Sequence, residues 1–325
     1  MADVGEMNGY ILDAPFSNEN AGFCRWTFAH KNGKKYFLKE LLNPVYPVSN
    51  KLQEKTKAIK IEECKEFEQK QLKLIDAINK GACGNVIRIE EFFRYDSHYY
   101  LATERVKDSG IKSADLMKYS FDDRLFLCGT LAYTAHMLHS VHFVHGDIKD
   151  TNIMLKKTPE GRIVGKIIDF DGGFLESNPP QYEDELVGDQ IYFAPEALIF
   201  LIGEEIKLTS KIDVFAFGLL FHKYLTGKLP DFNTKKYNYA HEAVLDDCVL
   251  KASKELPSDI RSLLEKMLLK DPDKRASMLD AVTVFRKHVY KETPEISIPL
   301  FGVKPVVKQE IKKDPSDYFS PAGDL

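Results

Sequence analysis

The chain has 325 residues, of which 44% are hydrophobic and 29% charged, and its formal net charge at pH 7 is −4. This length can hold one large domain or two lobes, and the nearly balanced charge gives no reason to expect nucleic-acid binding. No apolar run approaches the roughly 20 residues that cross a bilayer, and the first residues lack a secretion signal, so we expect no membrane association. Five widely spaced cysteines without a Cys-x-x-Cys pair argue against a disulfide framework or zinc site and favour a cytoplasmic location.

The first part of the chain, residues 10–105, is expected to be rich in β-strands with one helix. Two runs of aromatic and β-branched residues flank Asn32-Gly33, a pattern typical of a β-hairpin. Residues 52–79 place apolar side chains at helical spacing among many charged ones. Residues 85–106 then predict a second pair of strands.

The second part, residues 106–291, has mainly helical patterns. Residues 121–143 predict a helix, and residues 212–225 are apolar nearly all round, which indicates a buried helix. A further helix within residues 260–275 is expected to stop at Asp271-Pro272. Residues 292–325 lack periodicity and are interpreted as an extended tail. The outline is a small β-rich lobe followed by a larger helical one.

Four polar residues have the spacing that phosphoryl transfer requires. The stretch His145–Leu155 reads HGDIKDTNIML, in which Asp147 could orient an attacking hydroxyl and the amide oxygen of Asn152 could bind a metal ion. Lys149 would face the same cleft and could hold a phosphate. Asp169 ends a predicted strand beside a Gly-rich turn, which suits Mg²⁺ coordination. Either aspartate alone is more typical of a turn cap or strand end, but the combination favours phosphoryl transfer.

Here the chain resembles a known family. HGDIKDTNIML resembles the catalytic loop H-R-D-L-K-x-x-N of the eukaryotic-type (Hanks-type) protein kinases, and DFD at 169–171 resembles their metal-binding D-F-G. Gly146 stands where protein kinases usually have Arg. Both stretches are also similar to those of aminoglycoside and choline phosphotransferases, so these two motifs alone leave both families open.

Three later motifs favour the protein kinases. GDQIYFAPE at 188–196 resembles the substrate-docking segment that ends in A-P-E, and DVFAFG at 213–218 is similar to D-V-W-S-x-G. LLKDPDKRAS resembles L-x-x-D-P-x-x-R, whose Arg, here Arg275, pairs with the A-P-E glutamate, here Glu196. The resemblance covers residues 10–290. It implies a bilobal α+β protein-kinase-like fold, ATP with Mg²⁺ (or Mn²⁺) as cofactors, and a protein substrate.

By the same resemblance, YFLKEL at 36–41 places Lys39 at the α- and β-phosphates of ATP, with Glu68 on the following helix as its partner. The alternatives are an exposed strand lysine and a solvated glutamate. The Gly-rich loop departs from its pattern, because ENAGFCRW retains only Gly22 of the usual glycines. Phe37 stands where a small alanine normally covers the adenine, so that pocket is expected to be tighter or shifted.

The remaining nucleotide contacts are also implied by position in the family. The backbone of Glu104 and of Val106 would offer hydrogen bonds to adenine, and Met154 would lie beneath the base. Lys149 favours Ser/Thr over Tyr as the phosphorylated residue. Asp189 replaces a threonine that normally bonds to the catalytic aspartate and lysine, which puts the substrate selectivity in doubt.

Three functions follow from these observations. The main prediction is ATP-dependent phosphorylation of Ser or Thr in a protein. The departures in the Gly-rich loop and at Phe37 leave open a pseudokinase that binds nucleotide as a scaffold, and Gly146 leaves open a small-molecule phosphotransferase. Because Gly146 has no side chain to bind a phosphate in the activation segment, regulation is expected through a separate partner protein, abundance or the tail.

Overall fold

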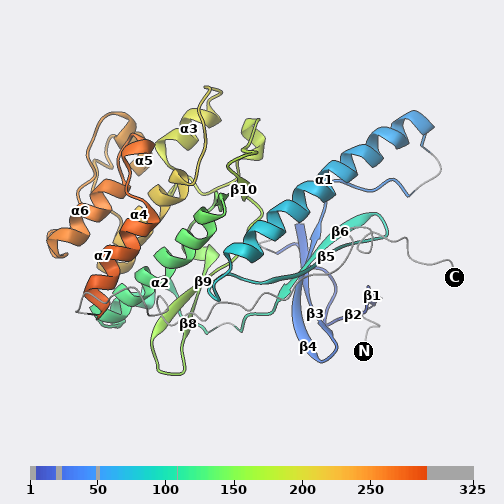
Figure 1. Ribbon diagram of the computed structural model, residues 1–325, viewed down its shortest axis with the longest axis horizontal. Helices are drawn as coiled ribbons and strands as arrows, with labels where there is room; N and C mark the ends of the chain where they lie inside the picture. Colours follow the sequence, from blue (N-terminus) through green and yellow to red (C-terminus); the bar gives the residue numbers. More distant parts are fainter. Residues whose placement is uncertain (1–4, 20–23, 49–51, 108, 291–325) are drawn as a thin grey trace. The chain divides into compact units, whose positions relative to one another are not determined.

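The computed structural model describes residues 5–19, 24–48, 52–107 and 109–290, and they fall into two compact units (Figure 1). The described part of the first unit runs to Asn79 and resumes at Ile87–Lys107. The second unit takes in Lys80–Val86 and the residues from 109 to 290. The tail expected over residues 292–325 lies outside the described residues.

The first unit is a six-stranded antiparallel sheet with the order β1-β2-β3-β4-β6-β5. Its strands are β1 Glu6–Met7, β2 Tyr10–Leu12, β3 Cys24–Lys31, β4 Lys34–Leu41, β5 Ile89–Tyr95 and β6 His98–Glu104. The hairpin predicted around Asn32-Gly33 is confirmed, since β3 and β4 pair across these two residues. Both have positive φ, 51° and 74°, as the tight turns that match strand twist require.

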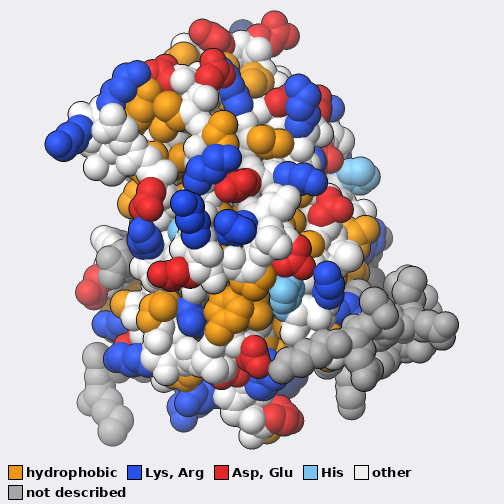
Figure 2. All heavy atoms as spheres, turned by 90° about the vertical axis from the view of Figure 1, so that its left-hand side faces the viewer, with side chains coloured by type: hydrophobic (Ala, Val, Ile, Leu, Met, Phe, Trp, Pro, Cys, Tyr) orange, Lys and Arg blue, Asp and Glu red, His pale blue; other side chains and the backbone are white. Residues whose placement is uncertain are grey.

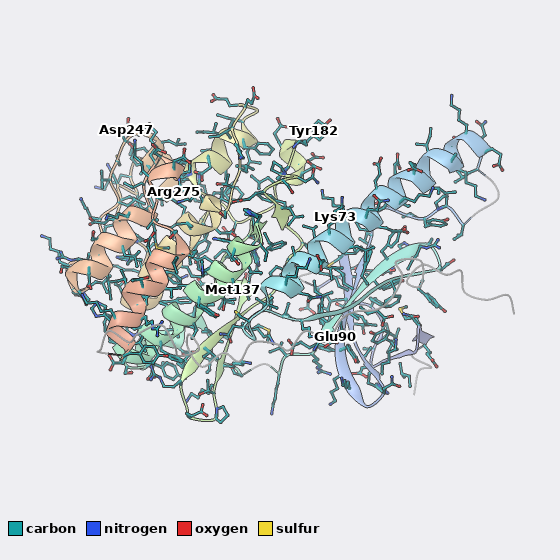
Figure 3. All side chains as sticks on the ribbon, in the orientation of Figure 1. Lys73, Glu90, Met137, Tyr182, Asp247 and Arg275 are labelled. Carbon is teal, nitrogen blue, oxygen red and sulfur yellow. The ribbon has the colours of Figure 1, made fainter. Side chains whose placement is uncertain are left out.

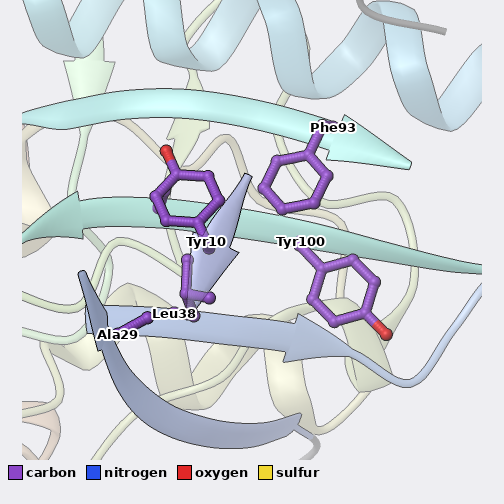
Figure 4. Close-up of a cluster of buried hydrophobic side chains, with 6 residues drawn as sticks. Tyr10, Ala29, Leu38, Phe93 and Tyr100 are labelled. Carbon is purple, nitrogen blue, oxygen red and sulfur yellow. The ribbon is translucent and has the colours of Figure 1, made fainter. Parts of the chain in front are cut away.

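Side chains alternate along β4 between two apolar clusters. On one face Leu38 packs with a cluster that includes Tyr10 and Tyr100 (Figure 4). On the other face Leu41 packs against Cys64 of helix α1, Glu54–Gly81. The helix expected over residues 52–79 is therefore confirmed, displaced by two residues. Because residues two apart share a face, Lys39 lies on the α1 side of the sheet.

The second unit consists mainly of helices (Figure 1). They are α2 Phe121–Ser140, α3 Pro195–Leu201, α4 Lys211–Thr226, α5 Ala240–Leu245, α6 Ser258–Met267 and α7 Met278–Tyr290. Short 3₁₀ turns are η1 Ser113–Lys118, η2 Asp150–Asn152, η3 Glu183–Glu185 and η4 Pro272–Lys274. The apolar sequence of α4 is explained by its packing, because α4 contacts both α2 and α6 and is buried along most of its length.

Two small sheets complete the second unit. They pair β7 Phe143–Val144 with β10 Phe174–Leu175, and β8 Ile153–Lys157 with β9 Ile163–Ile167. Two expected boundaries were wrong. The strand predicted to end at Asp169 ends at Ile167, and Asp169 has left the β region with a φ of 63°. The helix expected to reach Asp271 ends at Met267, and Asp271 instead caps η4 by accepting the N–H of Asp273.

The surface carries mixed charge. On the face that Figure 2 shows, Lys and Arg side chains are interspersed with Asp and Glu, and hydrophobic side chains lie between them. Among the described residues, none of the helices combines the length and apolar character that crossing a membrane requires.

A buried ion pair joins distant parts of the second unit. Arg275 donates from Nη2 to Oε2 of Glu196 at 2.7 Å and also bonds the other carboxylate oxygen through Nη1. Both side chains are almost fully buried, at 0% and 2% exposure. Further donors of Arg275 reach the carbonyls of Leu269 and Lys270, and Figure 3 places Arg275 among the helices. The pairing predicted from the sequence is confirmed.

We expect Arg275→Ala to lower the unfolding free energy by about 3–5 kcal/mol, because it leaves the Glu196 carboxylate buried without its charge partner. For a unit of this size the melting temperature should fall by roughly 10 °C. Thermal unfolding followed by circular dichroism measures the change. The control is Lys274→Ala, which removes an exposed neighbouring lysine paired with Asp271 at 2.8 Å and should cost no more than about 1 kcal/mol. Equal melting of the two variants would contradict the assigned role.

Candidate active site

The loop between β7 and β8 is held by one buried carboxylate. Asp213, in the first turn of α4, accepts the backbone N–H of His145 at 2.8 Å and that of Gly146 at 2.9 Å. Nε2 of His139 lies 3.1 Å from the same carboxylate. Asp213 is only 2% exposed, and a carboxylate is stable at such depth only when its oxygens are bonded. The motif DVFAFG therefore fixes the backbone just before Asp147.

Asp147 is the centre of a polar cluster within this loop. Its Oδ2 accepts from Nζ of Lys149 at 2.6 Å and from Nδ2 of Asn152 at 3.0 Å. Its Oδ1 accepts the backbone N–H of Asp189 at 3.2 Å. A carboxylate has about four acceptor directions, so Oδ1 retains the capacity to accept a proton-bearing hydroxyl. The two residues predicted at offsets of two and five from Asp147, Lys149 and Asn152, thus both bond its carboxylate.

The two predicted metal ligands are brought close by strand pairing. Ile153 of β8 pairs with Ile167 of β9, and the N–H of Ile168 donates to the carbonyl of Asn152 at 3.0 Å. Asp169 is the next residue and is exposed. Because Nδ2 of Asn152 is bonded to Asp147, its amide oxygen is the atom that can face a cation. Two oxygen donors fit Mg²⁺, which takes its remaining ligands from phosphates and water.

No group of three or more His, Cys, Asp or Glu side chains that could hold a metal ion occurs among the described residues. A metal at Asn152 and Asp169 would therefore depend on ligands from a nucleotide, which is how Mg²⁺ is bound in phosphoryl-transfer sites.

Two aromatic residues support this region without a chemical role. The ring of Phe170 lies 5.0 Å from that of His145 and 5.7 Å from that of Phe143. Nε2 of His145 lies 3.1 Å from the carbonyl of Ile168. These contacts pack the turn that carries Asp169 against the loop that carries Asp147.

The backbone explains why position 146 is glycine. Gly146 has a φ of 78°, which L side chains rarely adopt, and an added Cβ would lie 2.6 Å from the carbonyl oxygen of Gly172. Both conditions exclude arginine in this conformation. Glycine at position 146, where protein kinases usually have arginine, therefore allows the loop to pass close to the Gly-rich turn.

Asp189 does not interact with the cluster in the way the sequence suggested. Its carboxylate accepts the N–H of Ile191 at 2.9 Å within its own turn. The hydrogen bond to Asp147 is made by the backbone N–H of Asp189 instead of by its side chain. The backbone thus supplies the donor that a threonine side chain was expected to supply.

In the first unit, Lys39 occupies the middle of the sheet. It pairs with Trp26 on β3 and with Leu101 on β6. Glu68 lies on the α1 face that packs against the sheet, and its Oε1 accepts the hydroxyl of Tyr99 at 2.7 Å. Tyr99 is fully buried on the same sheet face, since it pairs with Leu41. Burial, followed by the bond to Glu68, raises the pKa of the Tyr99 phenol well above its usual range, so this hydroxyl remains a donor.

Aromatic rings cover the sheet next to Lys39. Trp26 and Phe37 are stacked with centroids 5.5 Å apart, and Phe28 meets both rings edge-on. The guanidinium of Arg105 lies 3.7 Å above the Phe28 ring. Phe37 was expected to alter the adenine pocket, and the structure places two more rings beside it.

The other predicted nucleotide contacts are spread over both units. Glu104 ends β6, and its N–H donates to the carbonyl of Arg88 at 3.2 Å, so its carbonyl is the backbone group that a base could use. Val106 follows β6, and Met154 lies on β8, partly exposed. Gly22 lies outside the described residues. These assignments stay predictions.

Sequence reasoning missed one group of residues. Asp150, next to Lys149, bonds Tyr192 of the docking segment and Lys223 of α4. The signal available was the charge of Asp150 inside the catalytic-loop motif, together with the tyrosine before A-P-E. Nothing in the spacing indicated that these residues meet.

Comparison with known proteins gives one family. The sequence profile "Protein kinase domain" matches residues 43–288, beginning after Lys39. The chain is 29% identical over 216 residues to serine/threonine-protein kinase PSK1 of Saccharomyces cerevisiae, covering 62% of this chain and 14% of the relative. It is 31% identical over 224 residues to serine/threonine-protein kinase ppk6 of Schizosaccharomyces pombe, covering 66% of this chain and 26% of the relative. The chain thus spans a minor part of these relatives' length.

We expect Gly146→Ala to destabilise the protein more than Gly161→Ala. Both glycines have a strongly positive φ, 78° and 83°, but only position 161 has open space for a Cβ. The shared conformational cost is about 1–2 kcal/mol, and crowding against Gly172 should add about 1–3 kcal/mol at position 146 alone. Urea unfolding of both variants measures the difference. Equal destabilisation would show that the close approach to Gly172 is not required.

Proposed function

Because the chain belongs to the protein kinase domain family, we propose that it transfers the γ-phosphoryl group of ATP to Ser or Thr hydroxyls of a protein substrate. The relatives named above are serine/threonine-protein kinases, which supports this substrate class. The single observation that carries the proposal is the convergence of Lys149, Asn152 and the Asp189 backbone on the carboxylate of Asp147.

This cluster suits the acceptor side of the reaction. The bonds to Oδ2 fix the orientation of the Asp147 side chain and leave Oδ1 to accept the hydroxyl of the substrate and align its oxygen. The ammonium of Lys149, 2.6 Å from Asp147, brings positive charge to the position where the transferred group would be negative. Lys149 therefore both orients the carboxylate and balances charge.

ATP would supply the phosphoryl group, and Mg²⁺ or Mn²⁺ would neutralise its phosphates. In this proposal the amide oxygen of Asn152 and the carboxylate of Asp169 hold the metal, and Lys39, with Glu68 as its partner, binds the α- and β-phosphates. Tyr99 supports this role, because its hydroxyl keeps one oxygen of Glu68 on the sheet face that carries Lys39.

One observation favours a second candidate, a pseudokinase that binds nucleotide as a scaffold. Trp26, Phe28 and Phe37 form a ring cluster beside Lys39, and Phe37 stands where the family usually has a small alanine that covers adenine. A base would have to stack on these rings instead of entering between small residues. Such an arrangement could bind nucleotide without efficient turnover.

Incubation with ATP labelled at the γ-phosphate, Mg²⁺ or Mn²⁺, and dephosphorylated casein separates the candidates. Label on casein or on the chain itself supports the protein kinase. Nucleotide binding by calorimetry without transfer supports the scaffold. Transfer to an aminoglycoside or choline, with none to protein, would assign the chain to small-molecule phosphorylation.

We expect Asp169→Ala and Asp147→Asn to abolish phosphoryl transfer while the protein remains folded. The first removes a metal ligand, and the second removes the charge that orients the acceptor hydroxyl. The matched control is Asp171→Asn, which changes the other aspartate of the D-F-D stretch and should keep most of the activity. Initial rates with labelled ATP measure the effect. Either site variant retaining more than about a tenth of the wild-type rate would contradict the assignment.

We also expect that phosphorylation of the activation segment is not required. Between Phe170 and Val187 the hydroxyl residues are Ser177 and Tyr182, and Tyr182 is 68% exposed and followed by Glu183, Asp184 and Glu185. A phosphate there would meet like charge and find no arginine at position 146. Phosphatase treatment and the Ser177→Ala/Tyr182→Phe double variant should leave the rate within about threefold of wild type. A loss of about tenfold in both would show that this modification governs activity.

A further inference from the structure

The carboxylate of Asp150 joins three separate elements of the second unit. Its Oδ2 accepts the hydroxyl of Tyr192 at 2.7 Å, from the segment before α3, and also bonds Nζ of Lys223 on α4. Asp150 itself lies in η2, between Lys149 and Asn152. A carboxylate that bonds both a phenol and an ammonium forms hydrogen bonds roughly twice as strong as neutral ones.

The cluster is buried enough for these bonds to hold their geometry. Tyr192 is 6% exposed. The second oxygen of Asp150, Oδ1, and the hydroxyl of Tyr224 are both buried and without a hydrogen bond among the described residues. Burial and then the nearby Asp150 charge raise the pKa of the Tyr224 phenol. The Tyr224 phenol is thus close enough to Asp150 for the charge of this carboxylate to act on it.

The same segment is also attached to the catalytic carboxylate. The N–H of Asp189 donates to Oδ1 of Asp147, and the N–H of Tyr192 donates to the carbonyl of Asp189 at 2.9 Å. The turn from Asp189 to Tyr192 is therefore fixed at both ends to residues three apart in the catalytic loop. Movement of Tyr192 would displace the backbone donor that bonds Asp147.

We propose that Asp150, through Tyr192, is a positioning residue that holds the docking segment of residues 188–194 against the catalytic loop and so sets the affinity for the protein substrate. Lys223 provides the opposite charge for this partly buried carboxylate. The inference rests on the proposed protein kinase function, because it assigns the segment to peptide docking. Loss of the bond between Asp150 and Tyr192 should therefore raise the KM for the protein substrate and leave the KM for ATP nearly unchanged.

The test compares Tyr192→Phe with a control of the same chemistry. Tyr237 donates its hydroxyl to Asp246 at 2.9 Å, and Lys236 bonds the same carboxylate oxygen. This second Tyr-Asp-Lys cluster joins the turn before α5 to Asp246 at the end of that helix, away from the catalytic loop in the sequence. Each substitution removes one hydroxyl and leaves the ring in place, so the variants differ in location and not in chemistry.

In Tyr192→Phe we expect amide hydrogen exchange within residues 188–194 to become faster by about tenfold or more, since a charge-assisted bond is lost. The KM for dephosphorylated casein should rise by a similar factor, with the KM for ATP within about twofold of wild type. Tyr237→Phe should leave all three quantities within about twofold. Asp150→Asn should also accelerate exchange, and the Asp150→Asn/Tyr192→Phe double variant should be no worse than the more affected single variant, because both act on one interaction.

Exchange and casein KM both within about twofold of wild type in Tyr192→Phe would overturn the inference. So would equal effects in Tyr237→Phe, which would reveal a general loss of stability. Exchange requires no turnover, so a wild-type protein that phosphorylates nothing would refute the proposed function while the exchange comparison still decides whether Asp150 positions the segment.

Discussion

The arrangement of the second unit depends on the buried carboxylate of Asp213. A loop that approaches a Gly-rich turn as closely as Gly146 approaches Gly172 cannot place side chains between the two backbones. Asp213 holds the loop from the other side by accepting two consecutive backbone N–H groups. These bonds offset the cost of burying a charge in an otherwise apolar helix. Asp147 directly follows Gly146, so the bonds from His145 and Gly146 to Asp213 also determine where the Asp147 side chain lies.

Two ion pairs that differ in burial connect residues 188–196 to the rest of the unit. The ion pair between Glu196 and Arg275 is fully buried and ties the A-P-E motif to the segment before α7. The Asp150 cluster is partly exposed and lies three residues after Asp147 in the chain. Removing one partner of the first pair should lower the unfolding free energy strongly. Changes in the Asp150 cluster are instead proposed to alter the affinity for a protein substrate.

The first unit combines Lys39, the proposed phosphate-binding residue, with an aromatic surface beside it. Lys39 keeps its central place in the sheet, and Tyr99 keeps Glu68 on the same face. The rings of Trp26 and Phe28 adjoin Phe37, the residue that stands at the position expected to hold a small alanine. Large aromatic side chains stack on planar groups, so these rings would offer a flat apolar surface to the base of the proposed nucleotide.

Much of this protein could be read from its sequence. The element types followed from local patterns, such as the turn residues Asn32-Gly33 and the apolar run of α4. The family followed from the order and spacing of the later motifs. The partnership of Glu196 and Arg275 also followed from the motifs that contain them. What only the tertiary structure decided are the contacts between segments far apart in the chain. Three features arise only when the loop, the docking segment and α4 pack together. They are the positive φ of Gly146, the backbone bond from Asp189 to Asp147, and the contacts of Asp150 with Tyr192 and Lys223. Periodicity reports which face of an element is buried, but only packing determines which polar group it meets there.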